Sequence, residues 1–151
     1  MKRVRSQGEM VAAFEASGRR ITPQRRAILG YIAGRSDHPS ARQIHRNLST
    51  RLPPPSLATV YNTLAALVEL GLIREVDFEA TDNRYDTNLA PHINLVCVRC
   101  GSIGDVDHDL PVQPAAIRSE LGFEAVDFRI EYRGLCATCR VSRSTEPGAK
   151  R

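Results

Sequence analysis

The chain has four cysteines, and they form two Cys-x-x-Cys pairs, Cys97/Cys100 and Cys136/Cys139. Both thiolates of such a turn can bind one cation, and two turns complete a tetrahedral shell of four sulfurs. A closed shell of this kind stabilises a fold and leaves no open position for a substrate. The spacing therefore predicts a structural zinc site in the C-terminal part of the chain, and it indicates that the function lies elsewhere.

Two other uses of the cysteines are less consistent with the sequence. Disulfides would require an oxidising compartment, but the basic start MKRVRSQGEM has no apolar run behind it, so we expect no secretory signal and a cytoplasmic protein. A thioredoxin-like redox pair opens a helix, whereas both pairs follow strand-like runs, INLVCVRC and FRIEYRGLC. No segment approaches the length of a membrane span, so we expect no membrane partner.

The charge of the chain is unevenly distributed. Residues 1–68 carry 11 Lys or Arg against 3 acidic residues, a net charge of +8, and because the whole chain is +4 the remainder is −4. A basic N-terminal half suggests a polyanionic partner for that half. Charge alone is equally compatible with a solvated basic surface.

Local signals predict four helices before residue 72. Capping residues such as Thr22, the box Ser40-x-x-Gln43 and Ser56 mark helix starts, and glycines mark helix ends. The predicted helices run over 10–16, from Pro23 to Gly34, from Ser40 through Leu48, and over 57–70. In the last of these, the apolar residues recur at helical spacing, and the opposite face is small and polar. The predicted buried residues are Leu57, Val60, Leu64, Leu67 and Val68, and the predicted outer residues are Thr59, Asn62, Thr63 and Ala66.

Two short strand-like runs, LIREVDF and NRYDTN, follow these helices. Helices followed by a two-stranded ribbon form a winged helix-turn-helix, in which the helix before the ribbon enters the major groove of double-stranded DNA. Asn62 is a candidate base reader because its amide can bond adenine at two positions. Earlier arginines would contact phosphates. The predicted DNA-binding residues are Arg19, Arg20, Arg25, Thr59, Tyr61, Asn62 and Thr63.

The pattern changes from Pro91 onward. INLVCV, SIGDVD and EAVDFRIEYRGL alternate like strands, and PVQPAAIRSELG reads as a helix. A unit this small has a thin core and open sheet edges, so zinc and a second copy of the chain would both stabilise it. A two-fold homodimer would also present two recognition helices to a palindrome. We therefore predict an α+β protein, with a DNA-binding domain over 1–88, a dimerisation domain over 89–141 and a disordered tail over 142–151.

A second group of residues suits a metal of another kind. It combines imidazole, carboxylate and amide donors without sulfur, a set that favours Fe(II) or Mn(II). Asn94 is two residues after His92 and so points to the same side of a strand. Taken singly, such residues are more often caps or surface groups, the role that we assign to His45 and His108. The predicted regulatory ligands are His38, Asp86, His92, Asn94 and Asp105.

Several motifs in this order resemble the ferric-uptake-regulator family. They are ITPQRRAIL, DHPSARQI, SLATVYNTLAALVELGLI, RYD, PHINLVCVRCG and the final CATC, and they span residues 20 to 139. The resemblance implies a dimeric, metal-dependent transcription factor with a winged helix and a zinc-bearing dimerisation domain. It also implies repression, and it maps the regulatory ligands onto the same five residues.

Within the family, the chain is most similar to the peroxide-sensing repressors. The residue after TVY is Asn62, both acidic ligand positions are Asp, and EAVDFRIEYRGL contains no histidine. The chain departs from the family at Asn94, where the usual pattern is His-x-His. A neutral amide oxygen is a weaker donor than imidazole and favours harder Mn(II), which weakens the inference of peroxide sensing.

Three rival functions follow from the same residues. One is a regulator of iron, manganese or zinc uptake that does not sense peroxide, because ligands alone do not settle the metal. Another is a metalloenzyme using His38, His92 and Asp86, although the chain has no HExxH motif, nucleophile elbow or phosphate loop. The third is a zinc-ribbon adaptor that binds only protein, which the basic N-terminal half disfavours.

Overall fold

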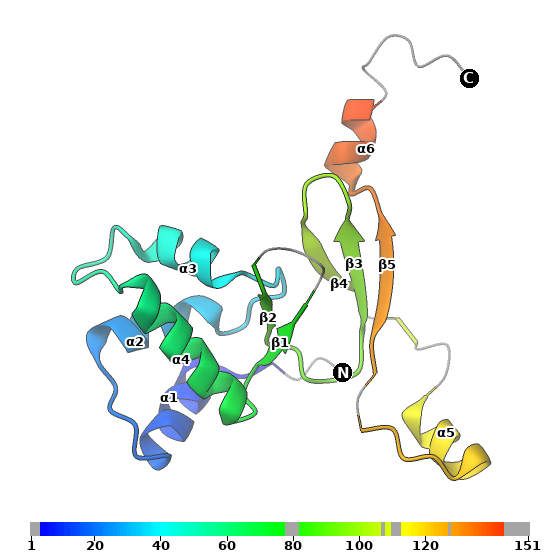
Figure 1. Ribbon diagram of the computed structural model, residues 1–151, viewed down its shortest axis with the longest axis horizontal. Helices are drawn as coiled ribbons and strands as arrows, with labels where there is room; N and C mark the ends of the chain where they lie inside the picture. The colour runs from blue at the N-terminus through cyan, green and yellow to red at the C-terminus, as the bar shows by residue number, and fades with distance from the viewer. Residues whose placement is uncertain (1–3, 78–81, 107, 110–112, 127, 144–151) are drawn as a thin grey trace. The chain divides into compact units, whose positions relative to one another are not determined.

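The structure is a computed structural model that describes residues 4–77, 82–106, 108–109, 113–126 and 128–143 (Figure 1). The chain divides into two compact units, residues 1–90 and 91–151. Among the described helices, none combines the length and the apolar character needed to cross a membrane.

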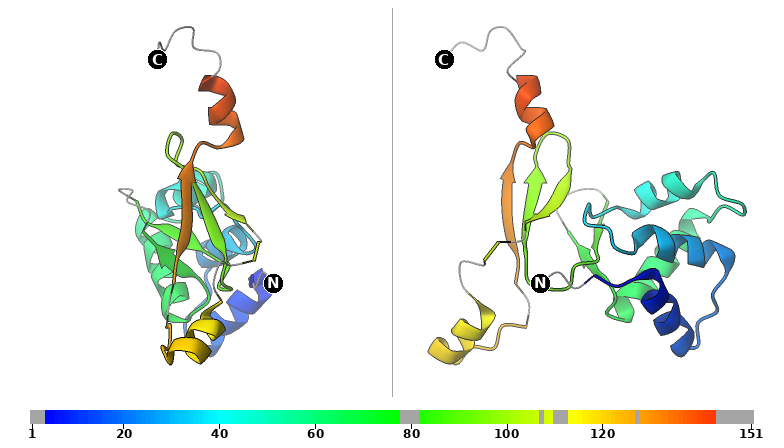
Figure 2. Two further views of the ribbon diagram at one scale, coloured as in Figure 1. Left: turned by 90° about the vertical axis from the view of Figure 1, so that its right-hand side faces the viewer. Right: turned by 180° about the vertical axis from the view of Figure 1, so that it is seen from behind.

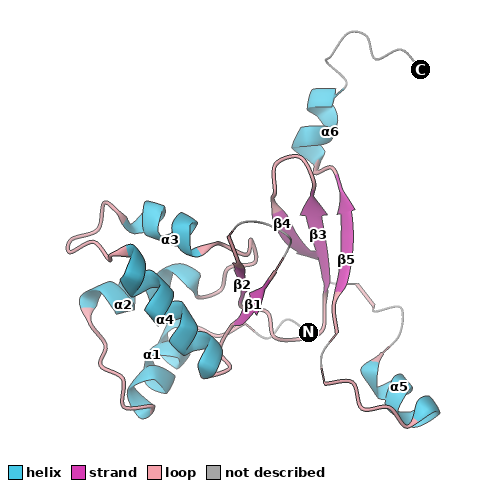
Figure 3. Ribbon diagram, in the orientation of Figure 1, coloured by secondary structure: helices cyan, strands magenta, loops and turns pink. Residues whose placement is uncertain are grey.

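The first unit is a winged helix. Its helices and strands follow one another along the chain (Figure 3) as α1 (Gln7–Ala16), α2 (Pro23–Ile32), α3 (Ala41–Leu48), α4 (Leu57–Glu69), β1 (Arg74–Val76) and β2 (Arg84–Asp86). The two strands pair in antiparallel register, with Glu75 opposite Tyr85. The four predicted helices and the ribbon are therefore confirmed, and the turn predicted between the strands lies largely outside the described residues.

Side-chain caps define where these helices begin. Thr22, Ser40 and Ser56 each accept a hydrogen bond from a backbone N–H three residues on, as their positions predict. Helix α1 begins earlier than expected because Ser6 and Glu9 form a capping box. The Ser-x-x-Glu signal for that box was present in the sequence and was missed.

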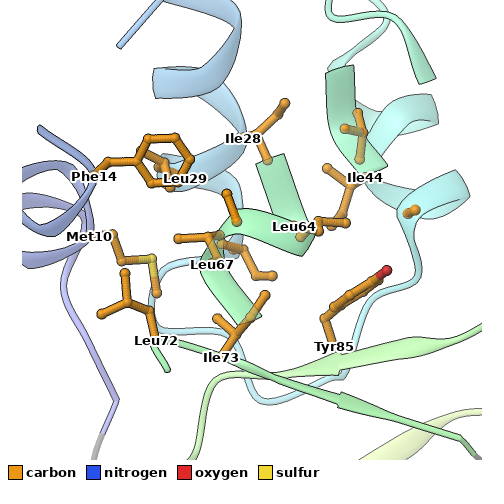
Figure 4. Close-up of a cluster of buried hydrophobic side chains, with 14 of the residues drawn as sticks. Met10, Phe14, Ile28, Leu29, Ile44, Leu64, Leu67, Leu72, Ile73 and Tyr85 are labelled. Atoms are coloured by element: carbon orange, nitrogen blue, oxygen red, sulfur yellow. The ribbon is translucent and has the colours of Figure 1, made fainter. Parts of the chain in front are cut away.

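A hydrophobic core joins the helices of the first unit to the ribbon (Figure 4). Met10 and Phe14 of α1 pack with α2 and with Leu64 and Leu67 of α4. Tyr85 of β2 belongs to the same cluster, and burial together with the nearby Glu75 carboxylate raises its pKa to about 12. The ribbon is thus anchored to the helical core beside α4, the helix in the position of a recognition helix.

The predicted outer face of α4 is wrong at Thr63 and Ala66. Thr63 is fully buried and its hydroxyl donates to the Thr59 carbonyl at 2.7 Å, while Ala66 is only 9% exposed. Thr63 lies three residues after Val60 and four before Leu67, so helical geometry places it on the side that packs. Its polar side chain tolerates burial because the backbone carbonyl satisfies it.

The second unit is a small α+β domain. It contains β3 (Ile93–Cys97), β4 (Ile103–Val106), α5 (Pro114–Leu121), β5 (Ile130–Gly134) and α6 (Ala137–Arg143). Strand β3 lies between β4 and β5, antiparallel to the first and parallel to the second, as the views in Figure 2 show. The three strands were predicted, as was the helix between the second and third of them along the chain, but β5 covers only the last part of EAVDFRIEYRGL.

Helix α6 was not predicted. Cys136 begins it in the manner of a cap, because its sulfur lies 3.5 Å from the donating Cys139 N–H and its carbonyl accepts from Arg140 N–H at 2.9 Å. Residues 142–143 belong to this helix, so the tail predicted to be disordered from residue 142 begins too early. The remainder of that tail, residues 144–151, lies outside the described residues.

Candidate metal centres and nucleic-acid interface

The four cysteines converge in the second unit. Cys97 ends β3, Cys100 follows in the turn before β4, and the other pair begins α6. Their sulfurs all lie within 4.8 Å of one another, and the sulfurs of Cys100 and Cys136 are 3.8 Å apart without forming a disulfide. Zinc–sulfur bonds of about 2.3 Å in a tetrahedron give sulfur–sulfur edges of about 3.8 Å. The spacing therefore fits a closed zinc shell.

Hydrogen bonds distribute negative charge among these sulfurs. Backbone N–H donation, chiefly from Cys136 at 3.4 Å, lowers the pKa of Cys97 to about 6. The Ser102 hydroxyl, 3.2 Å from Cys100, lowers the pKa of that thiol. The hydrogen bond with Cys136 and burial raise the pKa of Cys139 to about 12. Four adjacent thiolates repel one another, so a bound cation is what would hold all four deprotonated.

The expectation that neither cysteine pair opens a helix is wrong for Cys136 and Cys139. This pair does begin α6, as a redox-active pair would. Its sulfurs nevertheless share one cluster with those of Cys97 and Cys100, which a two-cysteine redox centre does not require. The geometry favours a structural zinc site over thiol–disulfide chemistry.

A first His/Asp pair is buried in the first unit. His38 Nε2 lies 3.5 Å from Asp86 Oδ1, and their side chains are 1% and 3% exposed. Asp86 Oδ1 also accepts the Asn88 N–H at 2.7 Å, which fixes the carboxylate at the end of β2. The backbone of His38 has a φ of 48°, in the left-handed region that non-glycine residues rarely adopt. A buried imidazole and a carboxylate at this distance can bind one cation together.

A second set of donors is buried in the other unit. His92 Nε2 lies 3.5 Å from Asp105 Oδ1, with both side chains less than a tenth exposed. Asn94 of β3 is directly opposite Asp105 of β4, so the two side chains lie on the same face of the sheet. The Oδ1 atom of Asn94 is buried and accepts no hydrogen bond from the described residues. A buried oxygen without a donor is suited to bind a metal ion.

The recognition helix exposes a narrow face. Asn62 is exposed on α4, and Tyr61 is 39% exposed with its hydroxyl 3.4 Å from an Asp82 carboxylate oxygen. Thr59 is half-buried, and Thr63 has no exposed surface to offer to DNA, which corrects its prediction as a DNA contact. The remaining outward surface is small and uncharged enough to approach base edges.

The three predicted phosphate-binding arginines differ in their surroundings. Arg20 is exposed. Arg19 donates to a Glu69 carboxylate oxygen at 2.6 Å, and Arg25 donates to the Arg20 carbonyl at 2.7 Å while lying over the Phe14 ring. The Arg19 guanidinium is therefore held at the end of α4, and the Arg25 guanidinium is held near the start of α2.

A winged helix joined to a unit with a four-cysteine zinc site and buried His/Asp donors defines a class, the metal-dependent transcription regulators. The chain belongs to the ferric uptake regulator family, whose model matches residues 16–133. Members of this family are regulators of transcription and not enzymes. The donors present fit the metals of such regulators, with zinc at the four cysteines and iron or manganese at the His/Asp side chains.

Relatives within the family are named for different signals, peroxide in some and a metal in others. A peroxide-responsive repressor PerR of Staphylococcus epidermidis is 32% identical over 133 residues, 87% of this chain and 89% of that protein. The structure of PerR from Streptococcus pyogenes is 32% identical, with a TM-score of 0.50 over 91% of this chain and 96% of that one. A zinc-bound manganese uptake regulator is 27% identical, with a TM-score of 0.66 over 84% and 98%.

Proposed function

We propose that this chain is a metal-responsive repressor that binds palindromic operators as a homodimer in the cytoplasm and senses peroxide through Fe(II). The observation that carries the proposal is the pair of buried His/Asp donor sets, one in each unit. The regulatory ligands would be His38 and Asp86 together with His92, Asn94 and Asp105. Either set alone offers too few ligands to fill an octahedral shell.

A site completed by residues of both units would couple metal to DNA. Binding would restrain the segment around Ala90 and so favour one spacing of the two recognition helices of the dimer. Thr59, Tyr61 and Asn62 would face the major groove, and Arg19, Arg20 and Arg25 would contact phosphates. By linkage, DNA would tighten metal binding by the same factor that metal tightens DNA binding.

The second unit offers a surface for a second copy of the chain. Leu95 and Tyr132 are 45% and 58% exposed, although they are register neighbours on adjacent strands. Exposed apolar residues on a small sheet mark an interaction surface, and a two-fold arrangement would bury the patch on both copies. This supports a homodimer formed through the second unit.

Peroxide sensing would act on the histidines. Bound Fe(II) would transfer one electron to hydrogen peroxide and recover it from the oxidised ring, so that the ring is the net reductant; Mn(II) does not readily give up that electron. The net reaction inserts one peroxide oxygen into a ring C–H bond of His38 or His92 and releases the other oxygen as water. The modified ring is a poorer donor, so the ligand set is lost and the DNA-competent state with it.

The experiment that tests this function needs no operator. Protein purified without oxygen is loaded with Fe(II), treated with a small excess of hydrogen peroxide, and analysed by peptide mass spectrometry. We expect one added oxygen atom on His38 or His92, and none in a Mn(II)-loaded control. His45 and His108 serve as internal controls, because neither belongs to a buried donor set. An absence of oxygen on both proposed ligands would contradict peroxide sensing.

Asn94 favours a second candidate function, a regulator of metal uptake that does not sense peroxide. Its amide oxygen is a harder and weaker donor than the imidazole it replaces, which favours Mn(II). The similarity to a manganese uptake regulator supports the same alternative. In that case metal would still control DNA binding, and histidine oxidation would be absent.

Replacing Asn94 by histidine is expected to tighten Fe(II) and Zn(II) binding at the regulatory site by about tenfold or more, since the added imidazole is a stronger donor for these metals. Asn94→Ala should weaken Mn(II) binding by a similar factor. Titrations of the zinc-loaded protein with each metal measure both effects. Mn(II) affinity unchanged in Asn94→Ala would show that Asn94 is not a ligand.

A further inference from the structure

The segment that carries His38 is bound to strand β2. Tyr85 N–H donates to the Pro39 carbonyl at 3.1 Å, and Ser40 forms a bridge with Arg84. Further along, the Thr87 hydroxyl donates to the Arg35 carbonyl at 2.5 Å. These contacts lay residues 35–40 along the strand that ends in Asp86, so both members of the buried His/Asp pair belong to one hydrogen-bonded arrangement.

Arg84 occupies the centre of this arrangement. Its Nη1 atom lies 3.3 Å from the His38 carbonyl and donates at 2.9 Å to Gln43 Oε1. The same Gln43 oxygen accepts the Ser40 N–H at 2.8 Å and closes the capping box of α3. One guanidinium therefore joins the backbone of His38 to the first turn of helix α3.

This contact bears on a backbone conformation that the segment would not adopt by itself. His38 has a φ of 48°, and a side chain with a Cβ disfavours that region. Its imidazole is also 1% exposed, so it has no freedom to compensate for a rotated backbone. The orientation of His38 towards Asp86 thus depends on the hydrogen bonds that hold its peptide, among which the Arg84 bond reaches the His38 carbonyl itself.

We propose that Arg84 is a positioning residue for the regulatory metal site, which holds His38 in its metal-binding orientation and connects it to α3. This inference rests on the proposed function, because it takes His38 as a metal ligand. It assigns a role to a side chain that is not itself a ligand. The Nη1 amino group of the planar guanidinium reaches both acceptors, and a lysine ammonium on its flexible stem would do so with less preorganisation.

The test uses the full-length, zinc-loaded protein with Mn(II) and Co(II) as probes. Arg84→Met keeps the aliphatic stem and removes the donors, and it should weaken Mn(II) binding by about tenfold, in the range seen when supports of metal ligands are removed. Arg84→Lys should restore part of this loss. The visible absorption of bound Co(II), which reports ligand geometry, should change in Arg84→Met, while zinc content stays the same.

Two controls separate positioning from general stability. Gln43→Met breaks the capping box but leaves the His38 carbonyl within reach of Arg84, so it should lower the thermal midpoint with a smaller loss of Mn(II) affinity. Arg42→Met removes an exposed arginine of α3 and should change neither. The inference is overturned if Arg84→Met binds Mn(II) like the parent, or if Gln43→Met weakens binding as much.

His38→Ala in the same assay separates the positioning role of Arg84 from the regulatory site itself. If His38→Ala loses Mn(II) binding and Arg84→Met does not, the positioning role fails and the regulatory site stands. If His38→Ala also binds Mn(II) like the parent, the assignment of the regulatory site itself fails.

Discussion

Replacing His38 or His92 by alanine is expected to abolish metal-dependent DNA binding while zinc content and dimerisation stay intact. Each substitution removes the imidazole from one of the two buried His/Asp pairs and leaves the carboxylate behind. A coupling of about 1–3 kcal/mol per site corresponds to a roughly 5- to 150-fold effect of metal on DNA affinity, and this whole effect should disappear.

The measurement is a fluorescence-anisotropy titration of a duplex selected from a random-sequence library in the presence of Mn(II). Each variant is titrated with and without Mn(II). The salt concentration is the same in all titrations, because phosphate contacts make the DNA affinity salt-dependent. His108→Ala is the matched control, since His108 is exposed. If either His38→Ala or His92→Ala retained Mn(II)-dependent binding, that residue would not be a regulatory ligand.

Replacing Cys136 by serine is expected to cost the protein its zinc, the fold of the second unit and the dimer. Apart from two of the cysteines, the buried apolar residues described in this unit are Ile93, Val96 and Ile103, a core too small to stabilise it alone. Structural zinc contributes on the order of 10–16 kcal/mol in zinc-finger peptides, which is more than a small core supplies.

The first unit should survive the same substitution. Its core includes Met10, Phe14, Leu64 and Leu67, all of them almost completely buried. Circular dichroism should therefore show helices retained with a loss of strand signal, and sedimentation should show monomers. Ser119→Ala, an exposed change on α5, is the control. A Cys136→Ser protein that remained dimeric without zinc would show that the metal is not needed for the second unit.

Local signals in the sequence predicted most of the first unit correctly. The caps at Thr22, Ser40 and Ser56 and the left-handed glycine Gly71 depend on residues within four positions of one another, so spacing alone reveals them. The box at Ser6 and Glu9 is equally local, but the apolar run that indicates this helix begins only at Met10. The zinc cysteines were found for the same reason, since each pair is a short-range motif.

Predictions failed where burial depends on packing partners. Thr63 looks like an outward polar residue by type, but its position between Val60 and Leu67 buries it, and a backbone carbonyl satisfies its hydroxyl. Helix α6 was missed because its cap is a cysteine sulfur, which is not among the usual capping residues. In both cases the structure depends on the position of the residue, and the type of the residue alone is a misleading guide.

The sequence by itself determined the winged helix and the zinc motif, because these follow from caps, helical periodicity and short spacings. The candidate regulatory ligands came from the chemistry of their side chains and from the resemblance to the family. Only the tertiary structure decided that β5 pairs parallel to β3, and that Arg84 reaches the His38 carbonyl 46 residues away. Such contacts join segments distant in the chain, and no local preference encodes them. The left-handed backbone of His38 belongs with them, since hydrogen bonds from β2 hold its segment in a conformation that its own residues disfavour.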